Sequence, residues 1–547
     1  MSAAVPGLRR ELVFGFVSPL GVNREIVVDA LRKALDDAAY ELHEIHVSET
    51  LYDFAPQSGT NLAKTLYLER KQVLMDAGDA MRRQWSRRMG ETSGDAVALA
   101  AILSLRQKRK ELNEDRKVQP IIDVVDSRRN RDLTEIPVPA TAYLLDSLKH
   151  PDELERLRAV YGPAFISIGI YTPPDAREKF LNGKARRADS DLRLKVLMRR
   201  DERGLEDDDE FGQRVADAFE QTDFIVAAND SLAVSMNRLV ELLFGNVHLT
   251  PSLDEFGMYL ARTAQALSSS LSRQVGASIL REDGSVVAVG TNEVPKPIVG
   301  GHYWPEDDDE VNGVGRDRVY HPFDTSHEFR AEMMRDVLDR LAGANLLAAG
   351  HCDPIMNSDE RLEVLYYARG GKLHAAKLRQ NIDYVRAVHA EAAALLDCAR
   401  HGVSVHGAQM FSTTFPCHEC SRHIVAAGIK RVLYLEPYHK SGTNKLYKDS
   451  IAIDPAEPQD TKVAFTTFVG VAPGRYLEFF ILGDRKRKNL NGSPITFSLS
   501  ETSAPRLPYY TPLSDATIYN ELQEVGAFTE FLGEHKSAPT INSGDYA

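Results

Sequence analysis

Four side chains in this sequence have the types and the spacing that a metal centre needs. Cys417 and Cys420 stand three positions apart, so both thiolates can reach one metal ion from a single helical turn. His389 offers an imidazole as a third ligand, and three protein ligands leave the fourth position of a tetrahedral zinc site open for water. Glu391, two residues after His389, can take a proton from that water and pass it to a substrate. The set predicts a catalytic zinc centre.

The competing interpretation of these residues is a zinc clip that only holds the fold together. A lone Cys-x-x-Cys would fit either role, but here Pro416 precedes the first cysteine and a strand gives way to a helix at that point. The spacing H-x-E followed by P-C-x-x-C is the signature of zinc-dependent deaminases, which favours catalysis. Cys398 falls on the apolar pattern of a helix and is expected in the core, whereas Cys352 has no Cys-x-x-Cys companion for a second site.

Alternating strands and helices are predicted around the four residues. Val275–Leu280 and Val286–Gly290 flank a polar turn, which is typical of a β-hairpin. A long insertion, about 303–384, is partly helical, most clearly over Ala331–Leu341. Together these elements predict an α/β layer unit. The remaining predicted elements are helices over 251–270, 389–401 and 417–427 and strands over 410–413 and 432–435.

The first half of the chain has the pattern of a second α/β domain. A strand at Leu12–Phe14, a loop and an amphipathic helix over 24–35 open it. A polar helical stretch spans about 60–115, and its basic part, Arg106–Arg116, is expected to be a solvated helix face, with contact to an anion or RNA as the alternative. Strands alternating with helices predict a parallel sheet. The further predicted strands are 120–126, 140–145 and 165–171.

The metal set lies within a longer resemblance to deoxycytidylate deaminases of the cytidine deaminase superfamily, over about residues 250–480. Thr413–Cys420 resembles their T-x-F-P-C-x-x-C, and Ser272–Ala277 resembles the S-x-x-V-G-A that leads into their first strand. Gly290–Pro295 resembles their G-x-N-x-x-P loop, and Glu436–His439 resembles the segment after their fourth strand. The resemblance implies a cytidine deaminase-like α/β/α domain with a mixed sheet. It also implies Zn²⁺ as cofactor, dCMP or dCTP as substrate, a homo-oligomer, and substrate contacts from Asn292, Thr413 and Tyr438.

The first half resembles the P-loop nucleotide-kinase-like domain of two-domain bacterial anti-phage deaminases, which deplete dCTP and dCMP during infection. Ala142–Pro151, Arg158–Gly162 and Leu243–Asn246 carry this likeness, together with Tyr303-Trp304 in the insertion. The order of the domains and the chain length fit as well. The resemblance implies a regulatory kinase-like domain over 1–247 and a deaminase domain over 248–500 that contains the insertion. The remaining residues, 501–547, form a tail whose Ser-, Thr-, Pro- and Gly-rich composition predicts an extended or frayed segment.

The phosphate loop of that first domain is degenerate. A Walker A loop reads G-x-x-x-x-G-K-[ST], with the lysine and hydroxyl on phosphate and Mg²⁺, but here five residues separate Gly15 from Gly21 and no lysine follows. Ser18 lies between the two glycines. We therefore expect no appreciable phosphoryl transfer. A sensing or scaffold role is favoured over binding of a nucleotide or a regulatory RNA.

Composition and net charge disfavour several classes of function. The net charge of −13 weighs against a general nucleic-acid coat, and with 8% aromatic residues it also disfavours the rival hypothesis of a deaminase that edits tRNA or single-stranded DNA. An inactive regulatory protein is disfavoured by the intact metal set. No apolar run is long enough to cross a bilayer, no signal core opens the chain, and four cysteines make no disulfide framework, so we expect the cytoplasm.

Overall fold

The structure is a computed structural model that divides into two compact units. Unit 1 comprises Met1–Glu255 and Val469–Ala547, and unit 2 comprises Phe256–Phe468. The sequence-based boundaries at 247/248 and 500/501 stay predictions beside these units. The residues that the structure describes are 11–54, 67–119, 131–184, 191–204, 210–271, 273–301, 304, 324–348, 356–368, 371–374, 376–381, 384–436, 441–455, 457, 459–483, 485–499 and 515–537.

Unit 1 is built on a mostly parallel sheet. Its strands are β1 (Leu12–Val17), β2 (Glu41–Ile45), β3 (Thr141–Leu148), β4 (Phe165–Tyr171), β5 (Phe224–Ala227) and β12 (Gly470–Val471). They lie in the order β12-β5-β4-β1-β3-β2, and only the β12–β5 pair is antiparallel. The predicted parallel sheet and three of its predicted strands are thereby confirmed; the fourth, 120–126, lies outside the described residues.

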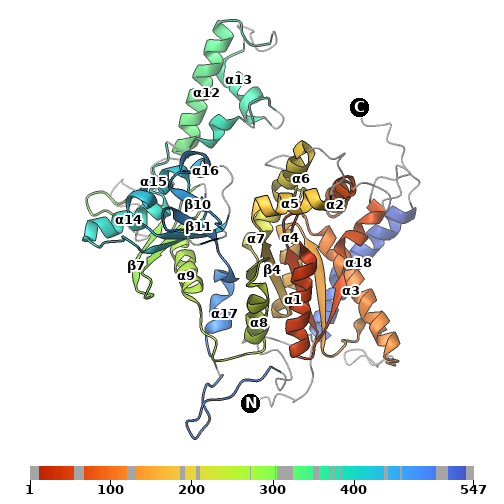
Figure 1. The fold of residues 1–547 in the computed structure, drawn as a ribbon. Helices are drawn as coiled ribbons and strands as arrows, with labels where there is room; N and C mark the ends of the chain where they lie inside the picture. The colour runs from red at the N-terminus through yellow and green to blue at the C-terminus, as the bar shows by residue number, and fades with distance from the viewer. Residues whose placement is uncertain are drawn as a thin grey trace. The chain divides into compact units, whose positions relative to one another are not determined.

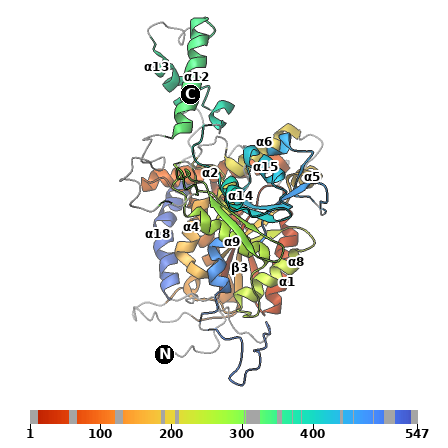
Figure 2. The same cartoon turned by 90° about the vertical axis from the view of Figure 1, so that its left-hand side faces the viewer.

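Helices cover both faces of this sheet. They are α1 (Arg24–Asp37), α2 (Tyr67–Met89), α3 (Ala96–Asp115), α4 (Pro151–Tyr161), α5 (Pro174–Lys184), α6 (Asp191–Arg203), α7 (Val215–Glu220), α8 (Leu232–Leu243), α17 (Tyr476–Phe480) and α18 (Asp515–Ser537). Figure 2 shows α1 and α8 on one side of the sheet and α4 and α18 on the other. The polar stretch predicted as one helical region over 60–115 forms two helices, α2 and α3. Gly90, with a φ of +71°, directly follows α2, and Asp95 occupies the N-cap position of α3.

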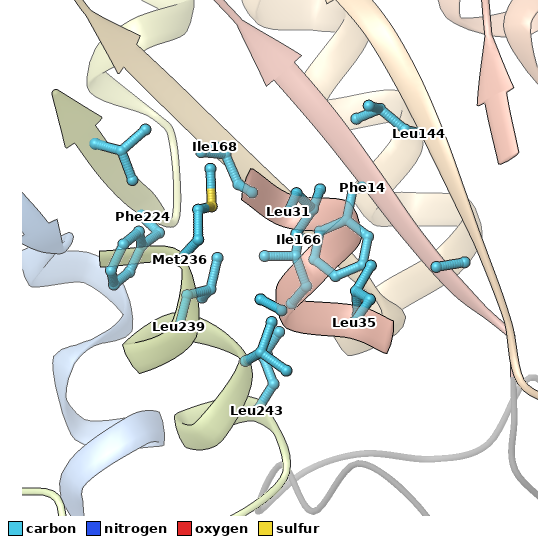
Figure 3. Close-up of a cluster of buried hydrophobic side chains, with 14 of the residues drawn as sticks. Phe14, Leu31, Leu35, Leu144, Ile166, Ile168, Phe224, Met236, Leu239 and Leu243 are labelled. Carbon is cyan, nitrogen blue, oxygen red and sulfur yellow. The ribbon is translucent and has the colours of Figure 1, made fainter. Parts of the chain in front are cut away.

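The core of unit 1 lies between the sheet and helices α1 and α8. Alternate strand residues point into it, among them Phe14 of β1 and Ile166 of β4. Figure 3 shows these side chains meeting Leu31 of α1 and Leu239 of α8. Each fully buried side chain of this size stabilises the fold by about 1.5–3 kcal/mol. The core fixes the sheet whose strand ends position the loops of unit 1.

Helix α18 docks on unit 1 through a buried ion network, which corrects two predictions. The guanidinium of Arg109 on α3 donates to Glu521 of α18 at 2.7 and 2.9 Å and to Glu11 at 2.9–3.1 Å, and all three side chains are fully buried. The basic part of α3 is therefore not a solvated face at Arg109, nor at Arg106, which is also buried and pairs with Glu521. The tail is likewise not extended over 515–537, because Phe528 and other apolar residues recur there at helical spacing and pack inward.

Replacing Glu521 with glutamine is expected to destabilise unit 1 by about 3 kcal/mol, because it leaves the buried Arg109 charge under-compensated. Urea unfolding, followed by the fluorescence of Trp85, measures the loss of stability. The ring of Trp85 on α2 packs against the ring of Phe528 on α18, with 5.0 Å between the ring centroids. The exposed Glu530→Gln change on α18 is the control and should alter stability by less than about 0.5 kcal/mol. Equal unfolding curves for the two variants would contradict the role given to the network.

Unit 2 carries a mixed sheet. Its strands are β6 (Gly276–Leu280), β7 (Val286–Thr291), β8 (Gln409–Thr414), β9 (Arg431–Glu436), β10 (Ile451–Ile453) and β11 (Val463–Thr467), in the order β10-β11-β9-β8-β6-β7. The β6–β7 hairpin and the β6–β8 pair are antiparallel, and the remaining pairs are parallel. This confirms the predicted mixed sheet and the hairpin. Outside the insertion, the helices of unit 2 are α9 (Leu253–Gln265), α14 (Ala390–His401), α15 (His418–Ala426) and α16 (Thr443–Leu446).

The insertion of unit 2 is helical in its described part. It contains α12 (Thr325–Gly343), α13 (Ser358–Leu362), a π-helical turn over Glu363–Tyr367 and a 3₁₀ turn over Lys377–Gln380. Helices α12 and α13 pack on each other around a small apolar cluster of their own that includes Leu338 and Tyr366 (Figure 1). No helix among the described residues of either unit has the length and apolarity to span a bilayer.

Candidate active site

The first predicted ligand stands at the start of α14. His389 is the N-cap residue of this helix and has an extended backbone, while Glu391 lies in its first turn. Gly290 of β7 allows the helix to lie directly on the strand, because a Cβ there would come within 2.2 Å of the Ala390 carbonyl oxygen. The close approach of α14 to β7 therefore fixes the place of both His389 and Glu391 against the sheet.

The second pair of ligands stands at the start of α15. Strand β8 ends at Thr414, and Cys417 then caps the helix by accepting a hydrogen bond from the Cys420 amide at 3.4 Å. Nδ1 of His389 lies 3.3 Å from Sγ of Cys417 and 3.5 Å from Sγ of Cys420. Zinc bonds of about 2.0–2.3 Å at tetrahedral angles separate ligand atoms by roughly 3.5 Å. The donor set and its spacing fit Zn²⁺, and these three residues would hold it.

Interactions within the cluster change the pKa values of Cys417 and His389. Hydrogen bonds from the Cys420 thiol and then from His389 lower the pKa of Cys417 to about 4. The thiolate form that results is the form that binds zinc. The hydrogen bond to Cys417 in turn raises the pKa of His389 to about 9. Binding of a cation would release the imidazole proton, because His coordinates metals in its neutral form.

Glu391 is a buried carboxyl beside the cluster. Its side chain is 4% exposed and its Oε1 accepts a hydrogen bond from Ser412 at 3.5 Å. Burial, and then the negative charge of Cys417, raise its pKa. A carboxyl with a raised pKa can hold and release a proton near neutral pH. Glu391 does not belong to the group of described ligand atoms that converge on one point, so its position suits proton transfer.

A cavity of about 270 Å³ opens from the cluster within unit 2. Its wall includes residues that the sequence analysis did not assign to the site. Asp324 and Arg330 come from the start of α12, so the insertion contributes to the cavity. The sequence signal for this helix start is Asp324-Thr325-Ser326, in which the Asp324 carboxylate accepts from the Ser326 amide. Others of this kind are Ser270, Leu271, Arg273, Val275, Thr325, Ser326, Val385, Ala387, Thr414 and Phe415.

The residues implied as substrate contacts lie in different places. Asn292 lines the cavity, but its side-chain amide also holds the preceding segment, accepting from the Val275 amide and donating to the Arg273 carbonyl at 2.6 Å each. Thr413 is buried in β8 and accepts from the Gly276 amide at 3.1 Å, which ties β8 to β6. Tyr438 lies outside the described residues. Substrate contacts by these three residues stay predictions. Cys398 lies in the core of unit 2, as expected, whereas Cys352 is not among the described residues.

The degenerate phosphate loop that the sequence analysis placed between Gly15 and Gly21 of unit 1 begins later in the structure. Gly15 lies inside β1, where a Cβ would come within 2.6 Å of Leu148 and 2.9 Å of Phe165, so close packing requires this glycine. Ser18 and Gly21 lie in the loop that follows β1 and line a cavity of unit 1. Gly21 has a φ of +95°, which favours glycine.

The comparisons with known proteins point to unit 2. Residues 251–436 match the family described as the cytidine and deoxycytidylate deaminase zinc-binding region. ComE operon protein 2 of Bacillus subtilis is 45% identical over 53 residues, which are 10% of this chain and 28% of the relative. The deoxycytidylate deaminase of Enterobacteria phage T2 is 44% identical over 54 residues, 10% of this chain and 29% of the relative. The deoxycytidylate deaminase of Mycobacterium phage D29 is 52% identical over 48 residues, which are 9% of this chain and 36% of the relative.

These matches cover a small part of each protein. The chain spans between 28% and 36% of the length of these relatives. The matched family region contains His389, Glu391 and Cys417, together with the cavity wall from Ser270 to Phe415. The chain therefore contains a region that matches a deaminase zinc-binding family, with Zn²⁺ as its cofactor. Within it, His389, Cys417 and Cys420 bring three ligand atoms close enough together to hold a metal ion.

Proposed function

We propose that the chain is a zinc-dependent hydrolytic deaminase of free deoxycytidine nucleotides, converting dCMP, dCTP or both to deoxyuridine nucleotides and ammonia. The observation that carries this proposal is the buried Glu391 carboxyl beside the cluster of His389, Cys417 and Cys420, at the end of a cavity of about 270 Å³. The family match and the phage deoxycytidylate deaminases among the relatives support a cytosine nucleotide as substrate.

Hydrolysis at the cytosine ring requires protons to move in both directions. When bound, zinc lowers the pKa of a water molecule towards 7 and so supplies the nucleophile at neutral pH. Glu391 accepts the proton that the water loses and gives it to the ring nitrogen as the new carbon–oxygen bond forms. It then takes the proton of the hydroxyl group newly bound to that carbon and passes it to the amino group, which leaves as ammonia when the carbon–nitrogen bond breaks and the hydroxyl oxygen becomes the carbonyl oxygen of uracil. Burial favours this cycle because it raises the pKa of the carboxyl.

We further propose that this activity depletes dCTP pools in anti-phage defence, with unit 1 regulating its output and the chain acting as a homo-oligomer. The resemblance of 142–162 to the kinase-like domain of anti-phage deaminases supports this role. Cells that express the chain should lower their dCTP level and survive phage challenge better than cells that express a Glu391→Ala variant. Equal dCTP levels and equal survival in the two strains would contradict the defence role.

A substrate panel separates the proposal from its rival, a deaminase that edits nucleic acid. The purified full-length chain is incubated with dCMP, dCTP, CMP and a cytosine-containing single-stranded DNA, and uracil products are measured by chromatography. We expect conversion of dCMP or dCTP at least ten times faster than conversion of the oligonucleotide, which is about 1.4 kcal/mol in favour of the free nucleotide. A faster reaction with the oligonucleotide would establish the rival function.

A further inference from the structure

Among the described residues, two arginines line the cavity that opens from the metal cluster of unit 2. One is Arg273, whose guanidinium forms an ion pair with Glu436. The Glu436 carboxylate is buried and also accepts a hydrogen bond from the Thr414 hydroxyl at 3.1 Å, so it compensates the charge of Arg273 within the protein. The other is Arg330, which comes from α12 of the insertion.

Main-chain groups hold the guanidinium of Arg330 in place. Its Nε donates to the carbonyl oxygen of Ser326 at 2.8 Å, and one terminal nitrogen donates to the carbonyl oxygen of Arg379. The carboxylate of Asp324 lies 3.7 Å from the other terminal nitrogen, which is too long for a hydrogen bond. No closer carboxylate pairs with Arg330 in the part of the chain that the structure describes. The guanidinium therefore has a fixed position, a charge that no hydrogen-bonded carboxylate neutralises, and further N–H groups for a ligand.

The start of α12 is connected to the segment that carries the first metal ligand. The Thr325 hydroxyl donates to the carbonyl oxygen of Tyr384 at 3.1 Å. Val388 forms a β-bridge with the loop that follows β7, and His389 comes directly after it. These contacts, all within unit 2, fix Arg330 in the same cavity as the metal cluster.

Phosphate groups are the ligands that suit this arginine. A guanidinium binds phosphate oxygens through two parallel hydrogen bonds. A terminal phosphate carries a charge of about −1.5 to −2 at pH 7 and presents three acceptor oxygens, whereas a phosphodiester in a strand carries a single charge. A nucleoside has no phosphate at all. Arg330 therefore favours a free nucleotide over the same base in a nucleoside or in a nucleic-acid strand.

We propose that Arg330 determines the substrate specificity of the zinc-site cavity by binding a phosphate group of the free nucleotide. This role rests on the proposed deaminase function and extends it, because it makes the insertion part of the selection of the substrate. Arg330 lies outside 272–277, 290–295, 413–420 and 436–439, the segments that resemble deoxycytidylate deaminases. Its role therefore follows from its contacts and not from that resemblance.

Steady-state turnover of the full-length, zinc-loaded chain with dCMP, dCTP and deoxycytidine tests this role. Arg330→Gln should lower kcat/KM for the preferred nucleotide about tenfold or more, mainly through KM, because it removes a charge-assisted hydrogen bond. The value for deoxycytidine should stay unchanged, since this substrate has no phosphate. Arg330→Lys keeps the charge but not the planar fork, so it should restore part of the loss.

Arg340→Gln is the matched control. Arg340 is an exposed cation of the same helix that pairs with Asp336 at the surface and does not line the cavity. Its replacement should leave kcat/KM unchanged for all three substrates. Zinc content is measured for each variant, so that a lost metal is not mistaken for a lost phosphate contact.

Calorimetric titration tells a wrong role for Arg330 apart from a wrong function. A Glu391→Gln chain, which is expected not to consume its ligand, should bind dCMP or dCTP more tightly than deoxycytidine. Adding Arg330→Gln should weaken the binding of the nucleotides alone. If the wild-type chain deaminates no nucleotide while this difference is observed, only the proposed reaction is wrong.

Other results refute the role of Arg330. It is refuted if no nucleotide binds, or if Arg330→Gln leaves both the turnover and the affinity of the nucleotides unaltered. An equal loss for deoxycytidine would show a structural role instead, and an equal loss in Arg340→Gln would show that the effect is not specific to the cavity. A cytosine-containing DNA strand that competes as well as dCMP would show that Arg330 does not select free nucleotides.

Discussion

A Glu391→Ala variant is expected to lose deamination almost completely while it keeps its zinc. Removal of a positioned proton-transfer group lowers the rate by about 10²- to 10⁴-fold. The metal should stay, because the ligand atoms that converge are those of His389, Cys417 and Cys420 and do not include this carboxylate. Ammonia release from dCMP and dCTP measures the rate, and metal analysis of the same sample measures the zinc content.

The matched control for this variant is Glu282→Ala, which removes an exposed carboxylate of unit 2 that pairs only at the surface with Lys430. It should keep both activity and zinc. A third variant, Glu391→Gln, keeps the size of the side chain and loses only its capacity to carry protons, so it should be as inactive as the alanine variant. Turnover near the wild-type rate in Glu391→Gln would show that the proton is carried by another group.

The metal site could be predicted from sequence because its information is local. The spacing of Cys417 and Cys420 places two donors on one helical turn, and the pattern around them defines the strand and helix that hold that turn. The third predicted ligand, His389, lies 28 residues before Cys417. The apolar pattern of the sequence predicts the helix that begins at His389. Each ligand therefore stands at a helix start that short windows of sequence reveal, and only their meeting required the fold.

The cavity wall could not be predicted in the same way. Arg330 reaches the zinc-site cavity from a helix that the sequence analysis treated only as an insertion. Nothing in the spacing of residues 324–330 indicates which other segment they face. The pairing of Arg109 with Glu521 is a more extreme case, since 412 residues separate the two side chains. A basic stretch on a helix is usually solvated, and only tertiary packing reveals that Arg106 and Arg109 of this one are buried and pair with Glu521 of α18.

The composition of a long segment also led to a wrong prediction for part of the C-terminal tail. The last 47 residues are rich in small and polar types, which suggested an extended tail. Within them, Ile518, Val525 and Phe528 recur at steps of seven and three, which is the spacing of one helical face, and all three are buried. A shorter window would have favoured the helix. The assignment of Gly15 to a loop was wrong for a different reason. The sequence alone does not distinguish a glycine that close packing requires within a strand from a glycine that a loop requires.

Cys417→Ala is expected to abolish both zinc binding and deamination. Loss of one of three protein ligands should weaken zinc binding by more than the 10- to 100-fold that loss of an outer partner of a ligand costs. Cys417 also has a second role, since its Sγ caps α15 by accepting from the Cys420 amide. An inactive alanine variant could therefore reflect either a lost ligand or a destabilised helix start, at about 1 kcal/mol for a lost cap.

Cys417→Ser separates these two roles. Serine is among the preferred N-cap residues, so it should preserve the start of α15, but its neutral hydroxyl is not one of the ligands that hold structural or catalytic zinc. We expect both variants to lack zinc and activity and only the alanine variant to unfold at a lower temperature. Cys398→Ala is the control, because this thiol lies in the core of unit 2 and is not one of the three converging ligand atoms, so its loss should leave the zinc in place. If Cys417→Ala retained a full equivalent of zinc and full turnover, the three residues would not be the metal site, and the deaminase chemistry assigned to Glu391 would lose its basis.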